Sequence, residues 1–306
     1  MIPRITLLAA LVVAASCHAD SPSIDSDSHE AEVVEWREGR LERLKAPTGY
    51  LNLAGLFWLQ DGRATFGSAP TNDIVFPDSA PALMGYLDVS EAGVVMHVAN
   101  DVMVVANGQP VVQVFMADDT TEAPVTASFG SMAWVIVKRA GRYALRLRDF
   151  EHPAIDAFPP LEYFPIDADF RVTATFKPFD EPRIANVGTV IEGLGYHPEV
   201  PGTVTFEIDG ETQNLEGYAV GDELFLVFGD ATSGRETYPA GRFLYVHWPK
   251  GGGETVLDFN KSYNPPCAFN DFSTCPVASP RNRMRTRIEA GELYDPDVHF
   301  TPESYH

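Results

Sequence analysis

Turn signals between short apolar runs constrain the fold of this sequence more than any other feature. Asp61-Gly62, Asn107-Gly108 and Ala140-Gly141 each separate two runs rich in β-branched, aromatic and other apolar residues. A dipeptide of this kind between two such runs predicts a β-hairpin. The predicted arms are residues 57–59 with 64–66, 102–106 with 111–115, and 134–138 with 143–148. We therefore expect the first half of the chain to form a β-sandwich.

The last predicted arm also indicates which of its faces is buried. Tyr143, Leu145 and Leu147 alternate with Arg146 and Arg148. Successive side chains of a strand point to opposite faces of the sheet. The alternation therefore predicts one face packed against the core and one face in contact with water.

Strand-like segments continue in the second half of the chain, after a proline-rich break. The break contains Glu151-His152-Pro153 and Phe158-Pro159-Pro160, and stretches of this kind separate domains. We expect one domain over residues 29–155, a second over residues 156–294 and a C-terminal arm over residues 295–306. The clearest strands of the second domain are residues 170–176, 203–208, 224–228, 243–248 and 255–259.

A helix is predicted before the first strand. Asp27 and Glu30 form a capping pair at its start, and Ala46-Pro47 ends it, because a residue before proline disfavours the helical backbone. The apolar positions at nearly helical spacing are Val33, Trp36, Leu41 and Leu44. The predicted fold class is mainly β: an N-terminal helix, a β-sandwich and a second β-rich domain.

The first 16 residues predict a signal peptide. Arg4 precedes an apolar run from Ile5 to Ala15, which is shorter than the roughly 20 residues that a membrane span requires. Ala14-Ala15-Ser16-Cys17 resembles a bacterial lipobox, in which a lipid is attached to the cysteine. We expect a lipid anchor at Cys17 on the periplasmic side of the cell envelope. Cleavage after Ala19, which would release a soluble periplasmic protein, is the alternative.

Composition limits the partners of the exported chain. Residues 17–28 are rich in Asp, Ser and Pro and predict a flexible tether. The whole chain has 22 Lys and Arg against 43 Asp and Glu, a formal net charge of −21. A field of this sign repels phosphate backbones and anionic lipid surfaces. We therefore expect no nucleic-acid partner, and membrane contact only through the lipid anchor.

Common catalytic motifs are absent from the sequence. It contains no Gly-x-x-x-x-Gly-Lys loop, no Gly-x-Ser-x-Gly elbow and no His-x-x-x-His pair among its eight histidines. We therefore predict no cofactor and no metal site, and the sequence leaves catalytic activity undecided.

Cys267 and Cys275 are the remaining thiols once Cys17 carries a lipid. Two cysteines in an oxidising compartment most often form a disulfide. The loop between them is short, and the chain-entropy model gives about 2–3 kcal/mol for closing it. A metal-binding or reactive-thiol role is the alternative.

Polar side chains are packed closely around the apolar strands between residues 230 and 264. Loops connected to strands are where binding groups are usually displayed. Arg242 has the geometry to clamp a carboxylate, and Asp258 can serve as a base or an ion partner. An internal Arg–Asp pair that ties a long loop to the sheet is the interpretation we favour, since turn-rich loops need such ties. The candidate ligand-binding residues are Asp230, Thr232, Glu236, Tyr238, Arg242, Asp258, Asn260 and Asn264.

Every second residue from 281 to 287 is an arginine. In an extended chain this period places all four guanidinium groups on one face. Four like charges repel, so acidic residues or an anionic ligand must lie opposite them. With 43 acidic residues in the chain, we expect internal pairing, and an anion site is the alternative. The four residues are Arg281, Arg283, Arg285 and Arg287.

Long motifs in the second half carry a family resemblance. They run from Leu257 to Phe269 and from Ile288 to Glu292, with Thr274-Cys275-Pro276 and Asn282-Arg283 between them. Thr232-Ser233-Gly234, Glu236-Thr237-Tyr238 and Gly241-Arg242 form an earlier block. Together they resemble the uncharacterised bacterial domain-of-unknown-function family sixteen-eighty-four. The resemblance covers most of the chain after about residue 35 and implies a grouping without an activity.

The N-terminal half resembles part of a forkhead-associated module. Thr65-Phe66-Gly67-Ser68, followed by residues 72–77, is similar to the stretch with which such modules read phosphothreonine. Those modules carry an arginine just after the glycine, where this chain has Ser68. The resemblance therefore implies a β-sandwich scaffold without phosphate binding.

These observations together predict an uncharacterised exported envelope protein, a lipoprotein that binds a small or peptidic ligand. The alternative is a hydrolase-type enzyme with a site around Arg242, Asp258 and Asn264. A third hypothesis is an assembly partner that uses the acidic surface, whose binding would weaken with added salt.

Overall fold

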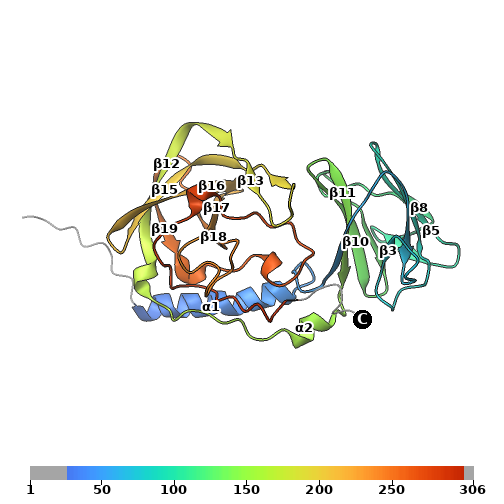
Figure 1. Cartoon of the computed structure of the whole chain (residues 1–306), viewed down its shortest axis with the longest axis horizontal. Coiled ribbons are helices and arrows are strands. Elements are labelled where there is room, and N and C mark those ends of the chain that lie inside the picture. Colours follow the sequence, from blue (N-terminus) through green and yellow to red (C-terminus); the bar gives the residue numbers. More distant parts are fainter. Residues whose placement is uncertain (1–25, 300–306) are drawn as a thin grey trace, which may run out of the picture.

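The computed structural model describes residues 26–299, which form two β-rich lobes. Figure 1 shows the lobes beside one another, with helix α1 (Ser26–Lys45) running along one side of the C-terminal lobe. Each lobe has a core of its own: one cluster of buried apolar residues comes from residues 54–147 and another from residues 174–290. The prediction of a mainly β fold with an N-terminal helix is confirmed, whereas the predicted domain boundaries stay predictions.

The N-terminal lobe contains two sheets packed face to face. Trp134 lies between the sheets, with its ring centroid 5.9 Å from that of Phe66 and 5.3 Å from that of Phe76. The first sheet has the spatial order β1 (Leu53–Trp58), β11 (Arg142–Asp149), β10 (Met132–Arg139), β9 (Thr126–Phe129), β6 (Val104–Ala106), β7 (Gln109–Val111). The second has the order β3 (Ile74–Val75), β2 (Gly62–Gly67), β4 (Gly85–Ser90), β5 (Gly93–Val98), β8 (Gln113–Phe115).

One of the three predicted hairpins is present as predicted, and a second is present with a different second arm, since residues 113–115 form β8 and pair with β5 in the other sheet. Strands β10 and β11 turn at Ala140-Gly141, and β6 and β7 turn at Asn107-Gly108; all four turn residues have positive φ, as a tight hairpin turn of this type requires. The predicted hairpin around Asp61-Gly62 is wrong. Strand β1 pairs with β11 and β2 pairs with β4, because the chain passes from one sheet to the other between them.

The C-terminal lobe contains a strongly curled sheet. Its two edge strands approach one another where the Thr255 hydroxyl donates to the His247 carbonyl at 2.8 Å. Apolar residues of the strands fill its interior, and all five predicted strand regions lie in it. The spatial order is β18 (Arg242–His247), β17 (Glu223–Phe228), β16 (Glu211–Val220), β15 (Glu199–Ile208), β12 (Arg171–Ile184), β19 (Gly253–Asp258).

Short elements complete the connections between strands. They are the two-stranded sheet β13 (Val187–Gly188) and β14 (Gly195–Tyr196), helix α2 (Pro153–Ala157), and the 3-10 helices η1 (Ala168–Phe170), η2 (Phe259–Lys261), η3 (Pro266–Ala268), η4 (Pro280–Asn282). No helix between residues 26 and 299 is both long and apolar enough to cross a membrane.

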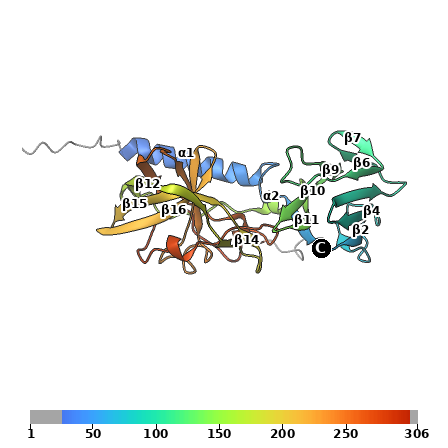
Figure 2. The same ribbon diagram turned by 90° about the horizontal axis from the view of Figure 1, so that it is seen from above.

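Helix α1 packs on the C-terminal lobe although it precedes the sandwich in sequence (Figure 2). His29 Nε2 lies 2.9 Å from Asp258 Oδ2, and Arg40 Nε lies 3.2 Å from Glu292 Oε2. All four of these side chains are buried. These contacts hold α1 against the C-terminal lobe. The C-terminal end of the helix lies near the junction between the two lobes (Figure 1).

Candidate functional site

The polar cluster predicted around Arg242 is closed to solvent. The Arg242 side chain is completely buried and donates hydrogen bonds to Asp230 (2.9 Å), to the Ile288 carbonyl (2.9 Å) and to the Ala290 carbonyl. Asp230 also accepts the backbone N–H of Thr232 at 2.8 Å. Arg242 thus forms an internal pair with Asp230 and not with Asp258.

Asp258 belongs to a separate contact. One of its oxygens lies 2.9 Å from His29 of α1, and the other accepts the Asn260 amide at 2.9 Å. Asn260 in turn donates to the Asp167 carbonyl at 2.8 Å. These bonds tie the helix and the chain before β12 to the end of β19.

The other candidates are also held by internal partners. Glu236 accepts from Arg287 at 2.8 Å, the Tyr238 hydroxyl donates to the Cys267 carbonyl at 3.0 Å, and the Asn264 amide donates to the Leu293 carbonyl at 2.7 Å. These interactions connect segments that are distant in sequence. They favour the structural role of the cluster over direct ligand contact, and the three residues of the hydrolase alternative, Arg242, Asp258 and Asn264, are buried. The buried members of the cluster are Asp230, Thr232, Arg242, Asp258, Asn260 and Asn264.

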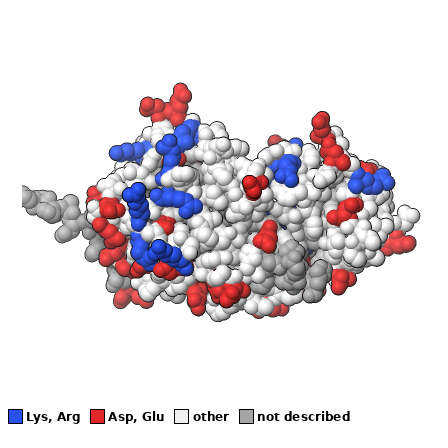
Figure 3. All heavy atoms as spheres, viewed as in Figure 1, with Lys and Arg blue, Asp and Glu red and all other residues white. Residues whose placement is uncertain are grey.

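The arginines of residues 281–287 lie on the surface of the C-terminal lobe. Figure 3 shows several Lys and Arg side chains close together on the visible face of this lobe, with Asp and Glu side chains around them. Arg281, Arg283 and Arg285 are exposed while Asn282 and Met284 between them are buried, so the predicted alternation is present. The segment forms no strand, and its last arginine pairs with Glu236 and Glu289.

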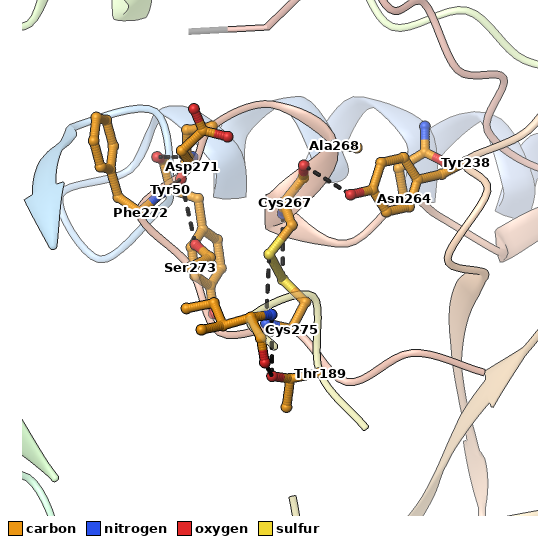
Figure 4. Close-up of a disulfide and its surroundings, with 12 residues drawn as sticks. Tyr50, Thr189, Tyr238, Asn264, Cys267, Ala268, Asp271, Phe272, Ser273 and Cys275 are labelled. Carbon is orange, nitrogen blue, oxygen red and sulfur yellow. Dashed lines mark hydrogen bonds between the residues drawn. A yellow bond between two sulfur atoms is a disulfide. The ribbon is translucent and has the colours of Figure 1, made fainter. Parts of the chain in front are cut away.

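Cys267 and Cys275 form a disulfide bond in the structure (Figure 4). The loop that they close lies against residues 189–194, since the Cys275 carbonyl accepts the Val190 N–H at 3.0 Å. Within residues 26–299 no group of three or more His, Cys, Asp or Glu side chains could hold a metal ion. Cys17, the predicted lipidation site, lies outside the described residues.

An open cleft lies at the junction of the lobes, and sequence reasoning did not find it. It consists of two adjoining cavities of about 350 and 580 Å3, a size suited to a small organic ligand. Arg40, Tyr50, Tyr245 and Tyr263 line both cavities. Several parts of the fold contribute its walls: α1 with the turn that follows it, strands β10 and β11 of the sandwich, strands β17 and β18 of the curled sheet, the β13–β14 segment, and the chain from η2 to the disulfide loop.

Aromatic side chains form one wall of this cleft. Phe225 of β17 stacks on Tyr245 of β18 with ring centroids 4.7 Å apart, and Phe243 packs edge-on against Tyr263 at 5.9 Å. Burial raises the pKa of both Tyr245 and Tyr263, so their hydroxyls stay protonated at neutral pH. No hydrogen bond joins either hydroxyl to another group in the described part of the chain. The wall therefore combines flat apolar surface with free donors.

The opposite wall carries arginines of the sandwich. Arg139 at the end of β10 and Arg146 in β11 line the cleft, on the face that the alternation in β11 had predicted to be wet. Arg40 enters from α1 and forms an ion pair with Glu292, whose pKa is raised because the carboxyl is fully buried. The sequence signal for this site is the pair Arg146 and Arg148 on one strand of a strongly acidic chain. The sequence does not show which residues lie opposite these two arginines.

Comparisons with known proteins agree with the family resemblance over the second half of the chain. Residues 156–293 match the model of a family described as "Protein of unknown function (DUF1684)". No curated protein matches the chain. The solution NMR structure of an uncharacterised protein of Haloarcula marismortui is 31% identical, with a TM-score of 0.39; the match covers 46% of this chain and 79% of that one. The predicted forkhead-associated likeness of the N-terminal half stays a prediction.

Proposed function

We propose that this protein, whose residues 156–293 match the model of the DUF1684 family of unknown function, is an exported envelope lipoprotein that binds a small ligand. The proposed binding site is the cleft between the lobes. The observation that carries the proposal is the wall of aromatic rings with free hydroxyls around a cavity of suitable size. Such hydroxyls can donate hydrogen bonds to a ligand whose apolar part packs on the rings.

Export and anchoring are supported by the beginning of the sequence. A short apolar run after Arg4, the lipobox-like residues before Cys17 and a polar spacer are typical of a bacterial lipoprotein. A disulfide between Cys267 and Cys275 is consistent with an oxidising compartment. Mass spectrometry of the mature N-terminus tests the anchor: we expect an acylated Cys17, and an unmodified N-terminus at Asp20 would refute it.

Native mass spectrometry tests the ligand site. Protein extracted from the envelope of the expressing bacterium is expected to carry a bound small molecule. Thr274 lines the cleft, so a Thr274→Trp variant fills part of the cavity and should lose that molecule. Thr175 is exposed on β12 and lies outside the cleft, so Thr175→Trp is the matched control and should retain it. Equal retention by both variants would show that the ligand binds elsewhere, and a wild-type protein without any bound molecule would count against the proposal.

A further inference from the structure

The cleft has a charge opposite to that of the protein as a whole. The chain carries a formal net charge of −21, yet among residues 26–299 Glu223 is the one acidic residue that lines the two cavities. Low-dielectric walls that carry one sign of charge raise the local concentration of ions of the opposite sign. The cationic residues that line the cavities are Arg40, Arg43, Arg139, Arg146 and Lys261.

Most of the buried positive charge in the cleft is already neutralised. Arg40 pairs with Glu292 at 3.2 Å, and Arg139 pairs with Asp119 at 2.6 Å. Lys261 of η2 pairs with Glu32. These three cations therefore have fixed internal partners.

Arg146 differs from the other arginines of the sandwich wall. Arg148, two residues further along β11, donates to the Gly49 carbonyl and to Asn52, which fastens the turn after α1. Arg146 forms no hydrogen bond or ion pair with any group in the described part of the chain, and its Nε is shielded from water. Burial and the nearby positive charges of Arg139 and Arg148 lower the pKa of Arg146 to about 10, and the Asp119 carboxylate, which is paired with Arg139, offsets only part of this shift. This guanidinium is thus half-buried among like charges, which is unfavourable unless an anion joins it.

We propose that the cleft binds a small molecule with an oxyanion group, a carboxylate or a phosphate, on a flat aromatic or apolar body. Arg146 is the counter-charge of the oxyanion, and the rings of Tyr245 and Tyr263 hold the body. Guanidinium groups bind both kinds of oxyanion through two parallel hydrogen bonds. The inference deepens the proposed function and depends on it, because it assigns a chemical class to the ligand of the same cleft.

The melting temperature of a variant distinguishes a ligand-binding Arg146 from a structural one. An arginine that holds the fold together lowers the melting temperature when it is replaced. An arginine without a partner is expected to do the reverse, so Arg146→Met should melt at a higher temperature than the wild type. A lower melting temperature, or failure of this variant to fold, would overturn the proposal, since it would give Arg146 a structural role.

Isothermal titration calorimetry in low-salt buffer measures the binding itself. The probes are phenyl phosphate, benzoate, inorganic phosphate and the neutral benzyl alcohol. We expect one of the two aromatic anions to bind, and Arg146→Met to weaken it by about 10- to 100-fold, since a hydrogen-bonded charge contributes about 1.5–3 kcal/mol. Arg142→Met is the matched control: Arg142 lies exposed on the same strand and outside the cleft, over the Trp58 ring, and its replacement should leave affinity within about threefold.

The relative affinities of the four probes test the anion and the aromatic part of the ligand separately. Tighter binding of phenyl phosphate than of benzoate assigns a phosphate, and the reverse order assigns a carboxylate. Inorganic phosphate that binds as tightly as phenyl phosphate would refute the role of the tyrosine wall. Benzyl alcohol that binds as well as the anions, or anions that bind equally to Arg146→Met, would overturn the anion site and leave the cleft as a binding site. Failure of all four probes would overturn the anion inference, whereas the Thr274→Trp experiment decides the proposed function separately.

Discussion

Replacement of Arg242 by methionine tests whether the buried cluster holds the C-terminal lobe together. The sequence left two roles for Arg242: a ligand clamp, whose loss would spare stability, and an internal pair, whose loss would not. In the structure its guanidinium bonds Asp230 and two backbone carbonyls, of Ile288 and Ala290. These bonds join β18 to the loop before it, through Asp230, and to the long segment that follows β19, through the two carbonyls. We therefore expect a large loss of stability from Arg242→Met.

The size of the stability loss follows from the burial of Arg242 and Asp230. Both partners of the ion pair have no exposed side-chain area, so methionine leaves the Asp230 carboxylate buried without a counter-charge. Removing one partner of a buried pair costs about 3–5 kcal/mol. The double variant Arg242→Met with Asp230→Asn also removes the stranded charge while it keeps an acceptor for the Thr232 N–H. It should therefore be more stable than Arg242→Met by about 1–3 kcal/mol, although less stable than the wild type.

Urea denaturation followed by circular dichroism measures these differences, and hydrogen exchange of peptides assigns them to a lobe. Because each lobe has its own core, the loss of protection should concentrate in β17 and β18 and spare β10 and β11. Arg281→Met is the matched control, since the Arg281 side chain is 74% exposed and its replacement should change stability by less than about 0.5 kcal/mol. A change below about 1 kcal/mol for Arg242→Met, or no recovery in the double variant, would refute the reasoning.

Two further predictions concern the disulfide and a buried histidine. Replacing Cys267 and Cys275 by serine should lower the free energy of unfolding by about 2–3 kcal/mol. Alkylation of the native exported protein should label neither cysteine unless a reductant is added. Two labelled thiols without reductant would contradict the disulfide. Burial lowers the pKa of His152 from 6.5 to about 4, so the neutral ring stabilises the fold above pH 6.5 and this contribution is lost as the pH falls through about 4. His152→Asn keeps an acceptor for the Ala154 N–H at the start of α2 and should lose less stability between pH 6.5 and 4; equal pH profiles would contradict the assignment.

The parts of the fold that local sequence determines were predictable. Ala140 and Gly141 adopt the left-handed backbone that their hairpin turn requires, so β10 and β11 follow directly from a dipeptide and its flanking runs. Strand β1 was assigned to the wrong partner because its true partner, β11, lies about ninety residues away in sequence. Nothing local distinguishes a pairing within one sheet from a crossing between two sheets.

The candidate site was beyond sequence reasoning for the same physical reason. Arg40, Arg146, Tyr245 and Tyr263 come from four separate segments, and only the packing of α1 and the sandwich against the curled sheet brings them together. Each of these residues, taken alone in the sequence, is as typical of a structural side chain as of a binding one. The polar residues between residues 230 and 264 are close in sequence, which made them the predicted site. The same closeness allows such groups to form hydrogen bonds and ion pairs with one another.

Arg242 and Arg146 show why partners, and not residue type, decide between a structural and a binding role. Both are arginines on strands of an acidic chain, and a sequence pattern treats them alike. Arg242 is completely buried and bonds a carboxylate and two carbonyls, so a ligand has no access to it. Arg146 lines a cavity near Arg139, Arg148 and the already paired Asp119, and a strongly perturbed group beside a cleft is where binding sites are found. Among residues 26–299 no acidic side chain forms an ion pair with Arg146, and Asp119, which acts on it electrostatically, already pairs with Arg139; this missing ion pair is the argument for the oxyanion proposed above.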